Sequence, residues 1–489
     1  MLPPLESITQ YQERSAYHRR SMAGGALDWS NQPGTIKHYP GAEAVPLPRE
    51  LILPRIEAAR ALIGRALREK EPLSLPLLAN LLFMAYGFTS RMDYGHQVFH
   101  YRSVPSAGAL YPTEIYLAAR DVQGLKDGLY HYNLEDFSLI HLAPGTPPPF
   151  VPAPALFLTA IYFRSAWKYR ERAFRYCLLD AGHVAENIQL VCPTLGLAAA
   201  WETEFDDDAL GAYLGLDPDR ERVLALFRLG DGPRATSSAA PPSQTRQALP
   251  GEPPSLHDQT PQLIRLVGRL TAQPLRPAPP RQPQEEPAAP APIPLPDPGG
   301  NDVAGPSLVQ ALQNRRSRRN FKLEALSGNE LSRALALILP PALDRHVHLG
   351  LVTSSVVSLP DGHYRYRPEQ RDLILKKAGF LSPALGEAAL NQEWVGRAGL
   401  VLAVSAPLPL LEQVLGPRAL RLAYLTAGRL GQRSYLAAEV LGWGCCGIGA
   451  FFDEELRQVL GLPAEESVLY LLSLGPYKKR THGGRQAED

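Results

Sequence analysis

Two short stretches that lie far apart in the chain have the residue types to bind a flat ligand that carries a phosphate. The first is residues 105–112, PSAGALYP. Small side chains and a glycine let the backbone approach a planar ring closely, and exposed N–H groups can donate to its carbonyl oxygens. Taken alone, this stretch is more simply a tight loop in front of a strand, so its interpretation depends on the rest of the chain.

The second stretch is residues 315–319, RRSRR. Four guanidinium groups around one hydroxyl can hold a phosphate and the polar edge of a flat ring through charge-assisted, bidentate hydrogen bonds. A solvated basic helix start has the same composition, so this stretch by itself is weak evidence for a ligand site.

An internal repeat relates the regions that carry the two stretches. Residues 177–197 align with 423–443 at an offset of 246, and the Tyr-x-Tyr segment 128–132 aligns with 362–366 at an offset of 234. A Leu-Ser pair near the start of each copy is separated by 253. The chain is therefore duplicated. The second copy is shorter before its Tyr-x-Tyr segment, which is where the first copy carries PSAGALYP.

Length and composition place the chain among globular proteins of two or three domains, with 489 residues, 45% hydrophobic and 20% charged. Of its 48 prolines, eleven fall in residues 273–299, a composition typical of a semi-extended, solvated linker. We predict an N-terminal extension (1–50), a first domain (51–234), a Pro-rich linker (235–304) and a second domain (305–489).

The hydrophobic pattern predicts mixed secondary structure. Apolar residues recur at helical spacing in 55–67, 75–86, 178–195, 262–270, 331–338 and 419–441. Short β-rich runs predict strands at 114–119, 156–162, 223–229, 347–352, 399–404 and 468–474. Helices, a hairpin, a long helix and a final strand follow one another in each copy, which favours an α+β fold over βαβ repetition.

Several classes of function are disfavoured. The formal net charge of +1 gives no reason to expect a nucleic-acid partner. The apolar runs are too short to cross a membrane and the N-terminus has no signal-peptide pattern, so we expect a cytoplasmic protein. The four cysteines and the isolated histidines lack metal-ligand spacing, so we expect no metal site.

Taken together, the motifs resemble the FMN-dependent, nitroreductase-like proteins, and within them the SagB-type dehydrogenases, or azoline oxidases. PSAGALYP, the GLYHY segment at 128–132, the DAGH sequence at 180–183 and RRSRR carry this resemblance. It implies two tandem nitroreductase-like domains. In that family two subunits share each FMN: one supplies RRSxR, a small-residue loop near flavin N5 and a basic pair, and the other supplies the Pro-Ser loop.

In this chain the two sets of motifs are divided between the copies. The second copy carries 315–319, a small-residue loop at 447–451 and a basic run at 478–480, whereas the first copy has the bulky, acidic 200–204 at the loop position. We therefore expect an intramolecular pseudo-dimer, a monomeric chain with one composite FMN site and an empty mirror-related site. The resemblance implies the cofactor-binding residues Pro105, Ser106, Ala107, Gly108, Arg315, Arg316, Ser317, Arg319, Ile448, Gly449, Ala450, Lys478 and Arg480.

The resemblance also implies a reaction, the oxidation of a thiazoline or oxazoline in a precursor peptide to the aromatic azole. A Lys-Tyr pair, here Lys168 and Tyr169, is associated with catalysis at this place in the family. Lys168 would remove the ring Cα proton as hydride leaves for the flavin, and would need desolvation to do so. Tyr169 would orient it or hydrogen-bond the developing charge. Dioxygen would reoxidise the flavin, and Arg102, Leu110 and Tyr111 would line the substrate pocket.

Two other interpretations stay open. One is a flavoenzyme that reduces nitro compounds or quinones, or that desaturates another natural product. The other is a catalytically degenerate scaffold that binds the peptide or a cyclodehydratase. A cyclodehydratase is also the partner expected if the protein is an azoline oxidase. The sequence does not distinguish thiazoline from oxazoline.

Overall fold

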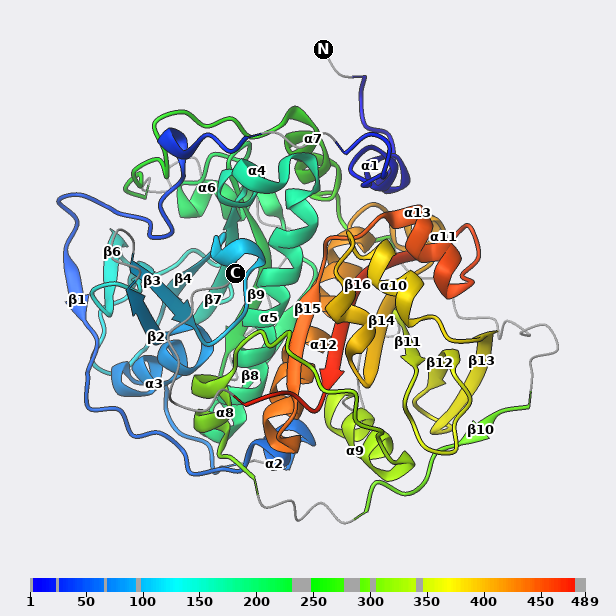
Figure 1. Ribbon diagram of the computed structural model, residues 1–489. Helices are drawn as coiled ribbons and strands as arrows, with labels where there is room; N and C mark the ends of the chain where they lie inside the picture. The colour runs from blue at the N-terminus through cyan, green and yellow to red at the C-terminus, as the bar shows by residue number, and fades with distance from the viewer. Residues whose placement is uncertain are drawn as a thin grey trace.

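Two antiparallel sheets with the same strand order form the framework of the protein (Figure 1). The computed structural model describes residues 3–22, 26–65, 68–93, 98–230, 248–276, 291–299, 305–339 and 346–479. The first sheet has the order β1 (Ala44–Pro46), β6 (Ser138–Pro144), β5 (Gly128–Asn133), β4 (Thr113–Ala119), β7 (Ala155–Ile161), β9 (Glu221–Leu229) and β8 (Ala199–Glu202). The second has β10 (Ile293–Pro294), β13 (Asp372–Ala378), β12 (Gly362–Arg367), β11 (His348–Thr353), β14 (Leu400–Ala406), β16 (Ser467–Gly475) and β15 (Gly444–Ile448).

Helices cover both faces of each sheet, which explains why the central strands are buried along their whole length. All seven residues of β4, of β7 and of β14 are buried. On the outer faces, α6 (Asp207–Leu214) packs on the first sheet, and α10 (Ser382–Ala388) and α13 (Asp453–Leu460) pack on the second. Among the described residues, no helix is long and apolar enough to span a bilayer.

Two long helices, α5 (Ala173–Thr194) and α12 (Ala419–Leu441), lie side by side between the sheets at the centre of Figure 1. Their buried side chains belong to one hydrophobic core that continues through both halves. The helices approach most closely at Gly182 and Gly428. A Cβ added to Gly182 would lie 2.3 Å from the carbonyl oxygen of Leu425, so neither position has room for a side chain.

The remaining helices complete the two halves. They are α1 (Ile8–Arg14), α2 (Ala58–Leu62), α3 (Leu75–Tyr86), α4 (Tyr162–Tyr169), α7 (Gln262–Leu270), α8 (Leu308–Asn314), α9 (Gly328–Ile338) and α11 (Leu408–Leu415). The predicted α+β fold is confirmed. Of the predicted helices, α3, α7 and α12 have the expected bounds, α5 begins earlier, and α2 covers only part of the expected 55–67.

The region that is longer in the first copy folds as a hairpin, which the sequence did not predict, followed by the predicted loop in front of a strand. β2 (Phe88–Asp93) pairs with β3 (Val98–Arg102), and the PSAGALYP loop connects this hairpin to β4. In the second half, only residues 339–347 separate α9 from β11.

The expectation that residues 273–299 are solvated and unpacked is wrong in part. Ile293 and Pro294 form β10, which pairs with the edge strand β13. A strand edge accepts a proline where no donor is needed, so a Pro-rich segment can still add to a sheet.

The duplicated unit also includes one more helix in each half. The Arg175 side chain of α5 donates through Nε to Ser15 Oγ (3.1 Å), just after α1. Arg421 of α12 donates through Nε to Thr271 Oγ1 (2.9 Å), just after α7. Helices α1 and α7 therefore occupy equivalent places, and the predicted bounds 51–234 and 305–489 leave one equivalent helix out of each half.

Candidate functional site

A cleft between the two halves brings the two sequence motifs together. It encloses about 710 Å³ of space, a figure that includes the open solvent at its mouth. The predicted cofactor residues that line it are Pro105, Ser106, Ala107 and Gly108 from the first half and Ser317, Arg319, Ile448, Gly449 and Ala450 from the second.

A buried carboxylate fixes the PSAGALYP wall of the cleft. Ser106 donates to Asp180 of α5 (Oγ to Oδ2, 2.5 Å), the Ala107 N–H donates to the same carboxylate (3.4 Å), and Ser106 Oγ accepts the Tyr111 N–H (2.8 Å). The loop needs this support because Gly108, Ala109 and Tyr111 all have positive φ. Burial raises the pKa of Asp180 to about 7, although Ser106 and Ala107 act in the opposite direction. We did not predict Asp180 as a site residue, although the DAGH sequence drew attention to it.

The facing wall is built from the RRSRR segment and β15. The Ser317 hydroxyl is 2.8 Å from the Tyr435 hydroxyl, which also accepts the Gly447 N–H at 2.9 Å. Ser317 thus lies beside β15, where it forms an isolated bridge with Cys445. The Arg319 guanidinium lies 5.7 Å from the centre of the Trp394 ring. This wall therefore combines hydroxyl, guanidinium and aromatic groups.

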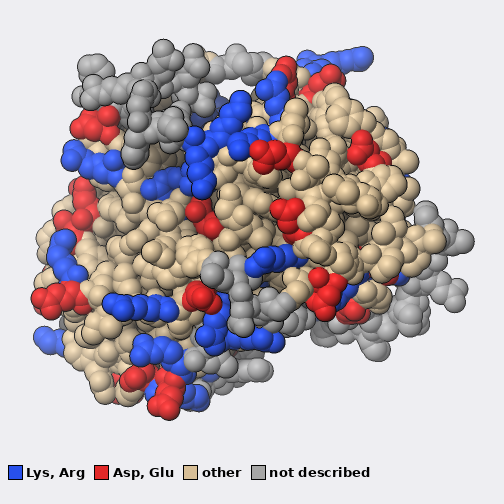
Figure 2. Space-filling view, turned by 60° about the horizontal axis from the view of Figure 1, so that its bottom comes forward, with Lys and Arg blue, Asp and Glu red and all other residues tan. Residues whose placement is uncertain are grey.

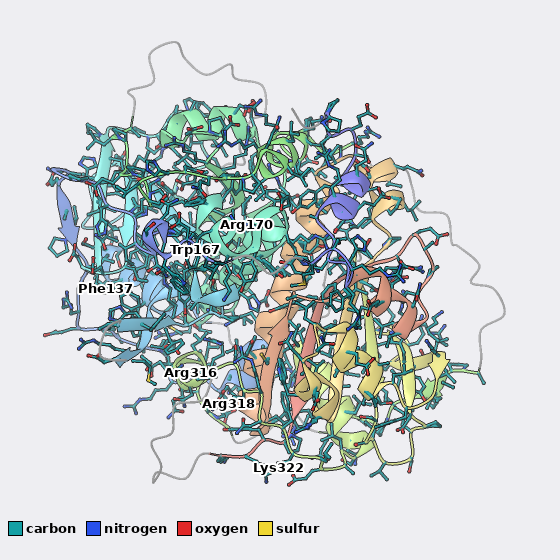
Figure 3. All side chains as sticks on the ribbon, turned by 45° about the horizontal axis from the view of Figure 1, so that its top comes forward. Phe137, Trp167, Arg170, Arg316, Arg318 and Lys322 are labelled. Carbon is teal, nitrogen blue, oxygen red and sulfur yellow. The ribbon has the colours of Figure 1, made fainter. Side chains whose placement is uncertain are left out.

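Arg315 and Arg316 are not among the residues that line the cleft, so their predicted contact with the cofactor stays a prediction. Arg315 is buried and donates to the carbonyls of Ser103 (3.1 Å) and Arg102 (3.2 Å), whereas Arg316 donates to Thr89 Oγ1 at 3.3 Å. Both side chains reach across to the first half and hold the halves together. Figure 3 shows Arg316 and Arg318 where α8 meets the neighbouring strands.

The small-residue segment approaches the first half so closely that it requires a glycine. Ile448 is the last residue of β15, so the predicted loop 447–451 begins as a strand. A Cβ on Gly449 would lie 2.4 Å from Cε1 of Tyr176, a buried residue of α5. The glycine is therefore required by the close packing of this segment on α5, and Gly449 and Ala450 both line the cleft.

The basic C-terminal run lies beside the RRSRR segment. The Lys478 N–H donates to the Asn320 carbonyl (3.0 Å), and Asn320 Nδ2 donates back to the Lys478 carbonyl (2.6 Å). The Lys478 side chain is exposed and does not line the cleft. Arg480 lies outside the described residues.

The Lys-Tyr pair lies at the end of α4, against the PSAGALYP loop. Tyr169 lines the cleft, packs 4.5 Å from the Tyr176 ring centre, and burial raises its pKa. Lys168 is exposed, and its Nζ lies 5.6 Å from the centre of the Tyr169 ring. A Cβ on Gly108 would meet Tyr169 OH at 2.9 Å and Lys168 Cδ at 3.4 Å, so both residues pack on the loop. Lys168 is thus near the cleft, without the desolvation that a lysine base requires.

The three residues predicted for the substrate pocket lie outside the cleft. Leu110 and Tyr111 are buried. The Arg102 guanidinium is also buried and stacks between the rings of Tyr86 (4.5 Å) and Tyr111 (4.3 Å). These residues support the loop from behind, because the turn at positions 109–111 directs its larger side chains into the core.

The mirror-related position in the first half is built differently. Trp201 of β8 occupies the place of the small residues of β15 and packs on the Phe227 ring, with ring centres 5.7 Å apart. The guanidinium of Arg429 lies 4.5 Å from the Trp201 ring centre and is paired with Glu186. A bulky ring and a salt bridge thus stand where the cleft has glycine backbone.

Comparisons with known proteins agree with the two-half architecture. The model of the nitroreductase family matches residues 46–231 and 312–476, and the chain belongs to this family. The crystal structure of "a putative nitroreductase" from Anabaena variabilis superposes with a TM-score of 0.75 at 28% identity, covering 97% of this chain and all of that one. The predicted tandem nitroreductase-like fold and the family resemblance are both confirmed.

Two curated relatives each match about a third of the chain. "Putative nitroreductase MJ1384" of Methanocaldococcus jannaschii is 33% identical over 199 residues, which are 37% of this chain and 96% of that protein. "Trifolitoxin-processing protein TfxB" of Rhizobium leguminosarum bv. trifolii is 30% identical over 181 residues, 32% of this chain and 48% of that protein. The chain thus matches about half the length of TfxB.

Proposed function

We propose that the protein is an FMN-dependent dehydrogenase that oxidises thiazolines or oxazolines in a ribosomal precursor peptide to azoles, with dioxygen as electron acceptor. The observation that carries this proposal is the cleft in which the PSAGALYP loop faces Ser317, Arg319, Gly449 and Ala450. Membership of the nitroreductase family supports the redox chemistry. The likeness to a trifolitoxin-processing protein supports a peptide substrate, with a cyclodehydratase as the partner that would supply it.

The residues present fit a flavin. The walls of the cleft carry tyrosine and tryptophan rings suited to a flat ligand, together with the Ser317 hydroxyl and the Arg319 guanidinium. Gly449 and Ala450 add backbone to the same lining. When bound, FMN would supply the hydride acceptor. Ser317 and Arg319 would hold polar edges of the ligand, and Lys478 and Arg480 are proposed to hold its phosphate. The backbone of residues 107–108 would face the ring from the first half.

The two halves are proposed to act as the two subunits of a dimer, with one FMN per chain. Trp201 and its contact with Arg429 disfavour a second flavin at the mirror position. The test is the flavin-to-protein ratio together with the mass in solution, where a monomer has 53.6 kDa. Two flavins per chain would refute the composite single site.

Lys168 is proposed as the base and Tyr169 as the group that orients it. Since Lys168 is exposed, the peptide substrate must bury it in the bound complex. Lys168→Ala should abolish azole formation, scored as a loss of about 2 Da per ring when two hydrogens are removed, while FMN stays bound. Lys126→Ala removes another exposed lysine from outside the cleft and should leave turnover unchanged. Equal turnover of all three proteins would exclude Lys168 as the base.

Reduction of nitro compounds or quinones is the second candidate function. The exposed Lys168 favours it, because such a reaction needs no desolvated base. NAD(P)H oxidation that depends on a nitroaromatic, combined with no mass change in an azoline peptide, would select this alternative. A protein that binds the peptide and takes up no FMN would instead be a scaffold.

A further inference from the structure

A buried ionic triad joins the two halves directly behind the cleft. Arg172 and Arg175, at the start of α5, both donate to Asp453 at the start of α13, with N to O distances of 2.5 and 2.6 Å. The two arginine side chains are 1% and 2% exposed. Tyr17 of the N-terminal segment donates its N–H to the same carboxylate at 2.9 Å. The triad therefore fixes the first half, the second half and the N-terminal segment to one another.

Arg172 also holds one particular peptide group of the cleft. Its Nε and Nη2 donate to the carbonyl oxygen of Gly449 at 3.1 and 3.0 Å. In a planar trans peptide the carbonyl and the following N–H point in opposite directions. The N–H of Ala450 is therefore directed away from Arg172. Gly449 and Ala450 line the cleft whereas Arg172 does not, so this N–H is directed toward the cleft.

The triad also places positive charge behind that peptide. Burial alone would raise the pKa of Asp453, but Arg172 and Arg175 together lower it, so two guanidinium groups face one carboxylate and the triad carries a net charge of +1. The rings of Tyr17 and Phe451 lie 4.6 and 4.7 Å from the Arg172 guanidinium and limit its contact with water. A charge in such surroundings acts more strongly on its neighbours than a solvated one.

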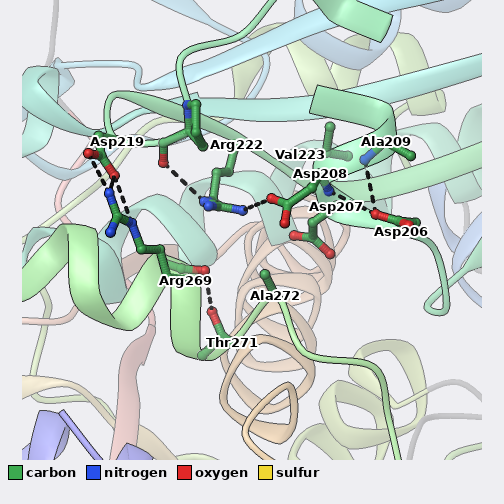
Figure 4. A network of polar contacts seen from close by, with 12 residues as sticks. Asp206, Asp207, Asp208, Ala209, Asp219, Arg222, Val223, Arg269, Thr271 and Ala272 are labelled. Atoms are coloured by element: carbon green, nitrogen blue, oxygen red, sulfur yellow. Dashed lines mark hydrogen bonds and ion pairs between the residues drawn. The ribbon is translucent and has the colours of Figure 1, made fainter. Parts of the chain in front are cut away.

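The internal repeat supplies a second triad of the same construction. Arg418 and Arg421 of the second half pair with Asp207 of the first, and each of these residues is offset by 246 from its counterpart. Arg418 Nη1 donates to the Thr203 carbonyl (3.1 Å), as Arg172 does to Gly449. Figure 4 shows Asp207 near the end of α7, which takes the place of α1. No PSAGALYP loop faces this second triad, because the second half lacks that loop.

We propose that Arg172 is a positioning residue that acts across the two halves: it turns the Ala450 N–H toward the flavin and, with the net positive triad, raises the reduction potential of the bound flavin. The inference rests on the proposed FMN site. Of the two N–H groups that could face flavin N5, those of Gly449 and Ala450, the geometry selects Ala450. Electron-rich reduced flavin is stabilised by a donor and a positive charge at this place.

The test compares matched variants of the full-length, FMN-loaded protein. Arg172→Gln removes the charge, and Arg172→Lys keeps the charge but cannot donate twice to one carbonyl. Arg418→Gln and Arg418→Lys make the same changes in the second triad. The flavin midpoint potential is measured by spectroelectrochemical titration, and unfolding is measured in parallel by calorimetry.

We expect Arg172→Gln to disfavour two-electron reduction at least tenfold, a shift of about 30 mV to lower potential. Arg172→Lys should give a smaller shift in the same direction, and both Arg418 variants should lose similar stability without a change in potential. Equal potentials in all five proteins, or equal shifts in the Arg172 and Arg418 variants, would overturn the inference. If Arg172→Gln fails to fold, the flavin midpoint potential of Arg172→Lys is compared with that of the Arg418 variants instead. A wild-type protein that takes up no flavin would refute the proposed function itself, whereas unchanged potentials with flavin bound refute only the role of Arg172.

Discussion

Replacing the glycine at the crossing of the two central helices should loosen the whole molecule. In Gly182→Ala, the new Cβ would lie 2.3 Å from the Leu425 carbonyl oxygen and 2.9 Å from the Gly428 Cα. Both are backbone atoms, so no rotamer change can relieve the contact. The helices α5 and α12 must move apart along the seam that joins the two halves.

The expected loss of stability in Gly182→Ala follows from the atoms that clash. Overpacking costs about 1–3 kcal/mol where side chains can adjust, and a backbone contact should lie at the upper end of that range. At about 2–4 °C per kcal/mol for a domain of 150–250 residues, the melting temperature should fall by about 6–12 °C. FMN affinity should also fall, because Asp180 on α5 and Tyr435 on α12 belong to facing walls of the cleft.

The assay is thermal unfolding by calorimetry, combined with fluorescence titration of FMN. Gly211→Ala is the control, since this glycine lies inside helix α6 and no heavy atom is within 4 Å of the place its Cβ would take. The control should be neutral or stabilised by up to about 1 kcal/mol. If Gly182→Ala melts within 2 °C of the wild type by the same scale, the close crossing does not hold the halves together.

Two further predictions concern the cleft. Gly449→Ala should weaken FMN binding at least tenfold, because its Cβ would lie 2.4 Å from the Tyr176 ring; unchanged affinity in the fluorescence titration would contradict the close approach. Burial raises the pKa of Asp180 to about 7, so the folded state binds more protons than the unfolded one between pH 4 and 7 and stability falls as pH rises through that window. Between pH 4 and 7 the free energy of unfolding, measured with denaturant, should fall by up to about 4 kcal/mol more in the wild type than in Asp180→Asn. Parallel pH profiles of the two proteins would show that Asp180 titrates normally.

The face shown in Figure 2 carries side chains of both charges. On the face shown in Figure 2, acidic and basic side chains are interspersed. The small net charge of the sequence disfavours a nucleic-acid partner.

The long elements were predictable from local pattern. Helices 75–86 and 419–441 have the predicted bounds because their apolar residues repeat at helical spacing over several turns. The β2–β3 hairpin and β10 were missed. β2 contains charged and polar residues with one exposed end, and β10 consists of an isoleucine and a proline, so neither carries a clear alternation.

The equivalence of α1 and α7 could not be found by alignment. The equivalence depends on the contacts of Ser15 and Thr271. The Ser15 hydroxyl accepts from Arg175 of α5, and the Thr271 hydroxyl accepts from Arg421 of α12. A serine and a threonine alone give no signal among the many in the chain. Contacts of this kind connect residues more than a hundred positions apart, so they become visible only when the chain is folded.

The sequence by itself determined that the chain is duplicated, that each half is α+β, and that one half carries PSAGALYP while the other carries RRSRR. Repeat offsets and small-residue motifs are local properties, so they can be read without a structure. Only the tertiary structure decided which side chains of these motifs face the cleft. Arg319 lines the cleft, whereas Arg315 donates to a carbonyl of the first half. Asp180 accepts from Ser106 of the PSAGALYP loop, although it lies on a helix more than seventy residues further along the chain. Side-chain direction depends on how α5 and α12 cross, and that is fixed by packing between the halves and not by either motif.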